Sequence, residues 1–262
     1  MPQPVDDLIT VERRLPAALV TLNLPEQRNP LSVTLMNKLR ETLKVVAADQ
    51  QVRVVVIKGA GKIFSSGHDL REMTNRTLDE QREIFDACTE MMQTIQRIPQ
   101  PVIAQVHGVA AAAGCQLVAT CDLAIAADST VFLTPGVRIG LFCSTPMVAL
   151  SRNVGRKRAM EMLLTGEPIN ASTAVDWGLI NRAVPDDELE SEVWQLVEKL
   201  AASSPVTIGI GKHAFYEQID MSQSAAYSQM SETMARNAID YDAQEGIGAF
   251  LEKRKPVWEG DR

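Results

Sequence analysis

Short hydrophobic runs separated by polar segments recur along the first two thirds of the chain. Residues 8–23 alternate apolar and polar positions on either side of Leu15-Pro16, which predicts two short strands joined by a turn. Three later runs, VRVVVIKG, PVIAQVHG and CDLAIAA, are apolar at almost every position, as strands buried on both faces are. We expect a further short strand at TVFLTP and the last strand at LINRAVP.

Apolar residues at helical spacing separate these strands. The pattern predicts a helix from Ser32 to about Ala48, and an amphipathic helix from Asp79 to Gln96 that Pro99 and Pro101 stop. The run VAAAAGCQLVAT predicts a helix of small residues between two buried strands, a backbone suited to close approach. After a loop at GVRIGLFCST, we expect a helix over residues 146–154.

Helical pattern dominates beyond Gly155. It covers RKRAMEMLLTG, ASTAVDWG, ELESEVWQLVEKLAAS and residues 205–218 and 222–255. The order of elements predicts an α/β fold, with an α/β core at residues 1–200 and a helical C-terminal region at residues 201–262.

Charge and composition narrow the classes of function. The chain has 262 residues, 26 of them basic and 33 acidic, and the formal net charge of −7 argues against nucleic acid as a partner. No window reaches about 18 uninterrupted apolar residues, so no membrane partner is expected. The N-terminus lacks a secretory or transit pattern. We expect a cytoplasmic protein, or a mitochondrial matrix protein if a presequence has been removed.

Metal and nucleotide motifs are missing from the sequence. The four cysteines form no C-x-x-C pair, the histidines are only His68, His107 and His213, and there is no H-E-x-x-H. We expect no metal, and buried free thiols. The glycines of GIGKH lie in a helical stretch without the strand, third glycine or acid of a dinucleotide fingerprint.

Two loops stand out on backbone grounds. FSSGHDL (residues 64–70) follows one buried strand, and AAAAGCQ (residues 110–116) opens a helix directly after another. The first turn of a helix has unpaired N–H donors and a partial positive charge, so two such donors converging on one point would stabilise an oxyanion. Tight helix packing is the alternative interpretation of the alanine-rich run.

The chain resembles the crotonase (enoyl-CoA hydratase/isomerase) superfamily in several motifs that occur in the family's order. LPEQRNPLS resembles its R-x-N-A-L region, FSSGHDL its F-x-x-G-x-D-L loop, and VHGVAAAAGCQLVATCDLAIA its N-G-x-A-x-G-G-G-x-E-L-x-x-x-C-D stretch. The segment from RKRAMEMLLTG to LINRAVP and the tail FLEKRKPVW are also similar. The resemblance implies a spiral of ββα units and a C-terminal region that forms a homotrimer or a dimer of trimers. It also implies acyl-CoA thioester substrates, with coenzyme A as part of the substrate and no separate cofactor.

The resemblance assigns the two backbone donors that hold the thioester carbonyl to His68 and Ala113. Ala112 and Ala113 replace the first two glycines of the family's triplet, which is tolerable if their φ values are negative. Ser66, Asp69, Leu70 and Gly114 are the neighbouring substrate positions. Arg28 and Lys253 resemble the family's coenzyme A phosphate contacts, the latter reaching in from a neighbouring subunit.

Both glutamates of the hydratases are missing. The position two residues after the glycine triplet is Gln116, and the position after the proline of the next loop is Gly136. Adding water to a double bond needs a base and an acid within hydrogen-bond reach, so simple hydration is disfavoured. Restoring both glutamates would raise hydration, provided that Gly136 tolerates a Cβ atom.

Other groups near these loops offer little acid–base chemistry. Residues 141–144, where related isomerases and dehalogenases place an acid, contain no carboxylate, and Cys143 is either a nucleophile or, more commonly, a small buried hydrophobe. The His68 side chain either orients a leaving carboxylate, as the similar G-H-D of malonyl-type decarboxylases suggests, or is exposed or bonded to Asp69 or Glu72. Asp69 is expected to cap a helix that begins at Leu70. Solvated positions are expected for Glu72, Asp86 and Glu90.

The sequence thus predicts an acyl-CoA-processing protein of the lyase or isomerase class that stabilises a thioester enolate in a backbone oxyanion hole. One alternative is a malonyl-type acyl-CoA decarboxylase or a thioesterase. The other is a non-catalytic acyl-CoA-binding protein, which the same two missing carboxylates favour.

Overall fold

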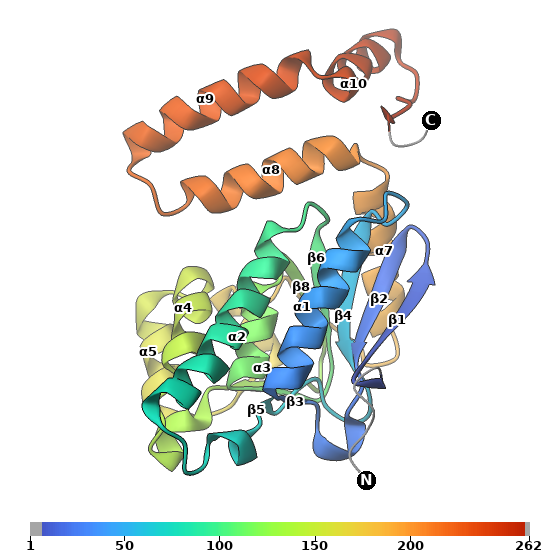
Figure 1. Cartoon of the computed structure of the whole chain (residues 1–262). Helices are drawn as coiled ribbons and strands as arrows, with labels where there is room; N and C mark the ends of the chain where they lie inside the picture. Colours follow the sequence, from blue (N-terminus) through green and yellow to red (C-terminus); the bar gives the residue numbers. More distant parts are fainter. Residues whose placement is uncertain (1–6, 260–262) are drawn as a thin grey trace.

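A six-stranded sheet forms the centre of the computed structural model, which describes residues 7–259 (Figure 1). The strand order is β1-β2-β4-β6-β8-β11, with β1 antiparallel to β2 and the other neighbours parallel. The apolar runs of the sequence are its inner strands. The bounds are β1 Ile9–Arg14, β2 Ala17–Leu22, β4 Val54–Gly59, β6 Val102–Val106, β8 Leu123–Ala127 and β11 Arg182–Val184.

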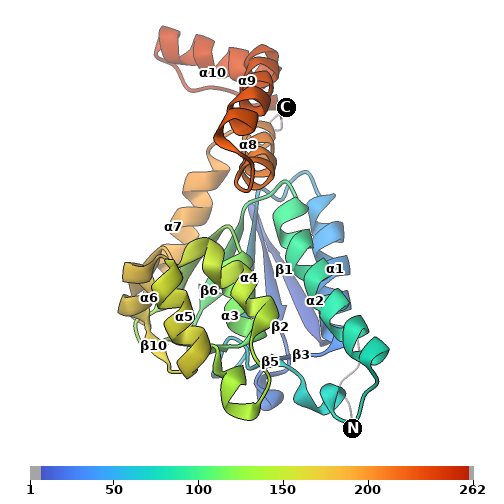
Figure 2. The ribbon, with the colours of Figure 1, turned by 90° about the vertical axis from the view of Figure 1, so that its left-hand side faces the viewer.

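Helices cover both faces of this sheet, which explains why its inner strands carry no polar alternation. Successive side chains of a strand point to opposite faces. In β4, Val55 and Ile57 join the core beneath α1 (Val33–Ala47), α2 (Leu78–Arg97) and α3 (Ala113–Thr120). Val54 and Val56 instead join a smaller core with α7 (Leu189–Ala201) on the other face (Figure 2).

Three successive units repeat the order long strand, short strand, helix. They are β4 with β5 (Gly67–His68) and α2, β6 with β7 (Val109–Ala111) and α3, and β8 with β9 (Val131–Leu133) and α4 (Ser144–Asn153). The short strands β7 and β9 pair in parallel, and a bridge between Ser65 and Ala110 ties the β5 loop to them. The spiral of ββα units is therefore confirmed, and the two loops singled out by sequence lie side by side in it.

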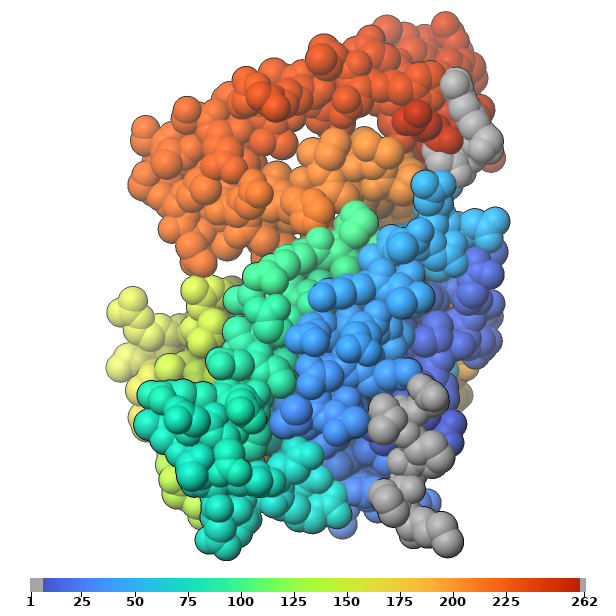
Figure 3. Space-filling model, in the orientation of Figure 1, coloured from blue at the N-terminus to red at the C-terminus, as the bar shows by residue number. Residues whose placement is uncertain are grey.

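The last three long helices form an arm that projects from the α/β body (Figures 1 and 3). The arm comprises α8 (Pro205–Gln218), α9 (Gln223–Ile239) and α10 (Tyr241–Glu252). No residue of α9 is buried. The division of the chain at residue 201 into a core and a helical C-terminal region stays a prediction.

One buried ion pair fixes α8 to the body. Lys212 Nζ lies 2.6 Å from Asp122 Oδ2 and also donates to the backbone carbonyls of Ile95 and Gln100. The Tyr216 hydroxyl donates to the other oxygen of Asp122. Burial lowers the pKa of Lys212, against the opposing effect of the Asp122 charge. The GIGKH segment thus has a structural role in attaching the arm.

The structure differs from the sequence pattern mainly in short elements. Residues 109–111 are a strand and not the first turn of a helix, and the loop expected from Gly136 begins with a 3-10 helix. The expected helix over residues 222–255 breaks at Asp240, which precedes α10 as its N-cap. Within residues 7–259, no helix is long and apolar enough to cross a bilayer. The remaining bounds are η2 Pro25–Gln27, β3 Pro30–Leu31, η3 Leu70–Met73, η4 Pro135–Ile139, α5 Arg156–Thr165, β10 Ile169–Asn170 and α6 Ala171–Trp177.

Candidate active site

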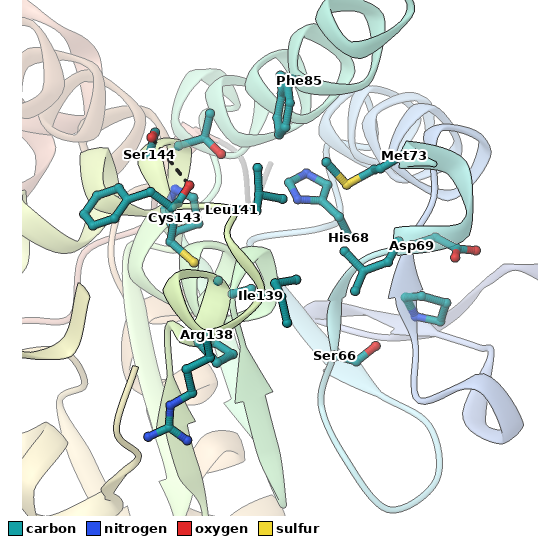
Figure 4. Close-up of a pocket in the computed structure, with 18 of the residues that line it drawn as sticks. Ser66, His68, Asp69, Met73, Phe85, Arg138, Ile139, Leu141, Cys143 and Ser144 are labelled. Atoms are coloured by element: carbon teal, nitrogen blue, oxygen red, sulfur yellow. Dashed lines mark hydrogen bonds between the residues drawn. The ribbon is translucent and has the colours of Figure 1, made fainter. Parts of the chain in front are cut away.

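A cavity of about 830 Å³ lies where the short strands meet the loop after β9 (Figure 4). Its walls come from residues 27–30, residues 66–73, the middle of α2, the start of α3, and residues 135–146. The lining is mostly apolar. It includes Leu70, Met73, Phe85, Ala112, Ile139, Leu141, Phe142 and Pro146.

Gly67 brings the β5 loop against the start of α3. Its φ of +89° is a conformation that residues with a Cβ rarely adopt, and an ideal Cβ there would lie 2.9 Å from Ala112 Cβ and 3.1 Å from the Ala113 nitrogen. Gly114 is equally constrained, because a Cβ would lie 2.7 Å from the Ser65 carbonyl oxygen. Glycine at both positions therefore allows the two loops to touch backbone to backbone.

Each of the two loops in contact has a backbone N–H that its own strand or helix does not use. Leu31 of β3 is paired with His68, and its carbonyl accepts the N–H of Asp69, so the parallel ladder directs the His68 N–H away from β3. Ala113 is the first residue of α3, whose earliest intrahelical bond runs from Gln116 N to Ala112 O. The N–H of Ala113 is therefore among the first-turn donors that have no partner within the helix.

Ala112 departs from the sequence expectation of a negative φ. Its φ is +49° and its ψ is −115°, outside the regions that residues with a Cβ favour, and its N–H donates to Leu133 O. Ala113 lies within the helix, so the expectation holds there. Strain of this kind persists only where the surrounding structure holds it. Ala112 directly follows β7, its N–H is bonded to Leu133 of β9, and Gly67 packs against it.

Hydrogen bonds of the Asn29 and Ser65 side chains hold the loops of the site together. The sequence analysis singled out neither residue. Asn29 is fully buried at φ +49°, and its side chain accepts the N–H of Leu24 and donates to the carbonyls of Ala60, Ile63 and Phe64. Ser65 Oγ donates to Asn29 O and accepts the N–H of Gly67. The one local signal for Asn29 was an asparagine before a proline in a polar loop, since asparagine tolerates a positive φ better than most residues.

The imidazole of His68 lies among apolar side chains, between Leu141, Met73 and Phe85 (Figure 4). It makes an edge-to-face contact with Phe85 at 5.5 Å between ring centroids. Burial lowers the pKa of His68 to about 4, so the ring is neutral near pH 7. Among the described residues Nε2 has no hydrogen-bond partner, and the bond to Asp69 or Glu72 that was one expectation is absent.

Asp69 supplies the one carboxylate among the described residues that line the cavity, and it is engaged elsewhere. As predicted it is an N-cap, here of the 3-10 helix η3, where it accepts the N–H of Arg71. The Arg71 guanidinium also bonds both carboxylate oxygens, which lowers the pKa of Asp69. Figure 4 shows the carboxylate turned away from His68. Asp69 therefore serves the loop and is not poised as a catalytic base.

Three other carboxylates were expected to be solvated, and one is not. Glu72 is half-buried and accepts the N–H of Val33, the first residue of α1, at 2.8 Å. The prediction was wrong there, because an unpaired helix-start donor lies within reach of the side chain. Asp86 and Glu90 are exposed, as predicted, and neither lines the cavity.

The two positions of the missing glutamates are enclosed by their neighbours. Gln116 is buried and accepts a weak hydrogen bond from the Cys88 thiol of α2, and it does not line the cavity. Gly136 lines the cavity, but an ideal Cβ would lie 2.0 Å from Leu141 O and 2.9 Å from Cys143 Sγ. A side chain at Gly136 therefore has no room, and the condition for restoring a glutamate there is not met.

Cys143 lines the cavity as a buried thiol. Desolvation raises its pKa, and a hydrogen bond from the Gly136 N–H opposes that effect only in part. A thiol that stays protonated near pH 7 is a poor nucleophile, which favours the interpretation of Cys143 as a small buried hydrophobe. All four cysteines are free and buried, and residues 7–259 contain no cluster of three or more His, Cys, Asp or Glu side chains suited to a metal.

Basic residues lie at the rim of the cavity and at the far end of the molecule. Arg28 lines the cavity, is exposed, and has no ion pair to another described residue. Arg71 and Arg138 also line it but are paired with Asp69 and Glu167. Lys253 is the C-cap of α10, and Figure 1 shows α10 at the opposite end of the molecule from β5. Ser66 and Leu70 line the cavity, whereas Ala113 and Gly114 of α3 are buried and are not among its lining residues.

Comparison with known proteins identifies the family. The family model described as Enoyl-CoA hydratase/isomerase matches residues 14–261. The chain belongs to this family. The crotonase resemblance is thereby confirmed, and with it membership of a family that processes acyl-CoA thioesters.

Several members of the enoyl-CoA hydratase/isomerase family are similar over nearly the whole chain. The rat protein named enoyl-CoA hydratase domain-containing protein 3, mitochondrial, is 46% identical over 240 residues, covering 91% of this chain and 80% of that protein. The 2,3-dehydroadipyl-CoA hydratase of Escherichia coli strain K12 is 32% identical over 253 residues, covering 96% and 98%. A crystal structure titled enoyl-CoA hydratase from Mycobacterium smegmatis has a TM-score of 0.94 at 46% identity, covering 98% of this chain and 99% of that chain.

Proposed function

We propose that the protein binds acyl-CoA thioesters in this cavity and polarises the thioester carbonyl with the backbone N–H groups of His68 and Ala113. The proposal is supported by the close approach of the two loops, since an ideal Cβ on Gly67, the residue before His68, would lie 3.1 Å from the Ala113 nitrogen. Donors fixed before the reaction stabilise a developing oxyanion without reorganising, so a thioester enolate is the species this site favours.

The rest of the cavity supports binding more than acid–base catalysis. Its largely apolar wall suits an acyl chain, and Arg28 at the rim is free to meet a phosphate of coenzyme A. Ser66, Asp69, Leu70 and Gly114 shape the loops around the thioester. Lys253 is proposed to contribute across a subunit contact, because within its own chain it lies far from the cavity.

Simple hydration is not part of the proposal. The enclosed Gln116 and Gly136 offer no acid or base, and the Asp69 carboxylate is held by Arg71. The same observation favours a second candidate, a non-catalytic acyl-CoA-binding protein, which differs only in lacking turnover. Turnover measured across a panel of acyl-CoA thioesters separates the two.

A carbonyl-specific measurement tests the oxyanion hole. Isotope-edited infrared spectra of bound acyl-CoA labelled with 13C at the thioester carbonyl should show the stretch at lower frequency than in water, because two donors polarise it. Ala113→Gly keeps the N–H and should preserve that shift. Ala113→Pro removes one donor and should reduce it, with a loss of about 10²–10³-fold in any thioester turnover. An unshifted carbonyl in the bound wild-type complex would exclude the oxyanion hole.

The name of the rat relative also bears on location. That protein is named as mitochondrial, which supports the matrix alternative for this chain over the cytoplasmic one.

A further inference from the structure

The Nε2 atom of His68 is the least explained polar atom of the cavity. It is buried, and no described residue offers it a hydrogen bond. The ring is surrounded by Phe85, Met73 and Leu141, none of which can donate or accept strongly. A buried polar group without a partner is unfavourable, so its retention here points to a partner that arrives with the ligand.

Three charged side chains of the loops around the cavity are committed elsewhere. Asp69 is bonded to Arg71, Glu72 caps α1 through Val33, and Arg138 on the facing loop is paired with Glu167. None of them is released without breaking a bond that holds a loop or a helix start. A molecule that fills the cavity is the source of a partner that breaks none of these bonds.

The chemistry of that partner follows from the charge of the surroundings. A neutral imidazole can donate one hydrogen bond or accept one, depending on its tautomer. A carboxylate placed beside it would be desolvated in an apolar wall, which is unfavourable. Arg71 and Arg138 are already paired, and the unpaired Arg28 at the rim is the proposed contact of a coenzyme A phosphate. An uncharged hydroxyl or carbonyl oxygen matches the site without that penalty.

We propose that the His68 side chain is a specificity-determining group that hydrogen-bonds an uncharged oxygen on the acyl chain, so that hydroxyacyl and oxoacyl thioesters of coenzyme A are preferred over plain acyl thioesters. This rests on the proposed function, since it takes the cavity as the acyl site. It assigns the imidazole a role separate from that of the His68 backbone N–H, which every substitution except proline retains.

Calorimetric titration with a matched set of ligands tests the proposal. Butyryl-CoA, 3-hydroxybutyryl-CoA, acetoacetyl-CoA and succinyl-CoA are compared on the wild type, His68→Leu and His68→Gln. The wild type should bind the two ligands with an uncharged oxygen about 3- to 10-fold more tightly than butyryl-CoA, the range expected for one neutral hydrogen bond. His68→Leu should abolish the preference, and His68→Gln, whose amide reaches a similar position, should restore part of it.

The other possible results separate the role of the imidazole, the class of the ligand and the proposed function. Equal binding of butyryl-CoA and the oxygenated ligands by the wild type, or a preference unchanged in His68→Leu, overturns the role of the imidazole while leaving the cavity as the acyl site. A His68-dependent preference for succinyl-CoA overturns the uncharged class and assigns a carboxylate. Failure of all four thioesters to bind counts against the proposed function instead.

Discussion

An ideal Cβ on Gly136 would lie 2.0 Å from the carbonyl oxygen of Leu141, and the Leu141 N–H donates back to Gly136 O. The chain after η4 therefore folds over the space that a side chain at Gly136 would need. The absence of a glutamate there is built into the loop, which must move before any substitution at this position can act. The condition set for restoring both glutamates, that Gly136 tolerates a Cβ atom, is therefore not met.

The first prediction tests that contact by adding one methyl group. Gly136→Ala should lower the free energy of unfolding by about 1–3 kcal/mol, because the new Cβ must displace the Leu141 carbonyl and Cys143 Sγ. Urea denaturation measures the change. Gly211→Ala is the matched control, since a Cβ there meets nothing within 4 Å in helix α8, and it should be neutral or stabilising. Equal stability of Gly136→Ala and the wild type would mean that the loop is not closed as described.

The second prediction concerns the attachment of the arm. Lys212→Met should destabilise the protein by about 3 kcal/mol, because it leaves the Asp122 carboxylate without its cation in a site where the two side chains are only 6% and 15% exposed. Asp220→Asn breaks the exposed pair with Arg152 and should change the free energy of unfolding by less than about 0.5 kcal/mol. Similar small effects of both substitutions would refute the anchoring role of Lys212.

The third prediction follows from the lowered pKa of His68. With a pKa of about 4 in the folded state against 6.5 in the unfolded chain, the folded state binds fewer protons between those values. The contribution of His68 to stability is therefore complete above about pH 6.5 and is lost as the pH falls towards 4. Relative to His68→Leu, the wild type should lose on the order of 2 kcal/mol between pH 7.5 and 4. Urea unfolding at several pH values measures it.

A non-titrating substitution away from His68 is the control for that experiment. Met162→Leu, at a buried position of α5 that does not line the cavity, should shift the free energy of unfolding by the same amount at every pH, because neither side chain titrates. If the difference in free energy of unfolding between the wild type and His68→Leu is also independent of pH, then the imidazole is solvated in the folded state.

The fourth prediction concerns assembly. Met234, Ile239 and Phe250 of the arm are 75%, 79% and 82% exposed, and no residue of α9 is buried. We expect sedimentation to give a homotrimer or a dimer of trimers of the 28.7 kDa chain, and Met234→Glu with Ile239→Glu to dissociate it. Val45→Glu, at an exposed apolar position of α1, should leave the assembly intact. A stable monomer at micromolar concentration would also exclude Lys253 as a contact across subunits.

The fold and the two site loops could be predicted because their signals are local or continuous. Buried parallel strands appear as apolar runs, and the long helices as apolar residues at helical spacing. The short strands β3, β5 and β10 have only two residues each, too few for any period to show. Their positions depend on contacts between loops that are distant in sequence.

The environment of individual site residues was harder to predict for the same reason. The sequence places His68 in the correct loop, but the burial of its ring depends on Phe85 and Leu141, which other elements supply. The pairing of Lys212 with Asp122 and the closure of Leu141 over Gly136 are also long-range or conformational facts. No periodicity or motif in the sequence indicates these contacts.

Hydration of crotonyl-CoA, measured beside acyl-CoA binding, shows whether this cavity supplies acid–base catalysis. General acid–base assistance contributes about 10²–10⁴-fold per positioned group, so a site without either glutamate should hydrate crotonyl-CoA several orders of magnitude more slowly than an enzyme of ordinary turnover. Binding of butyryl-CoA, measured on the same preparation, should persist, because Arg28, the apolar wall and the backbone donors do not depend on Gln116 or Gly136. A kcat within the ordinary range of about 1–10³ s⁻¹ would contradict the account, since another residue would then have to supply the acid and the base.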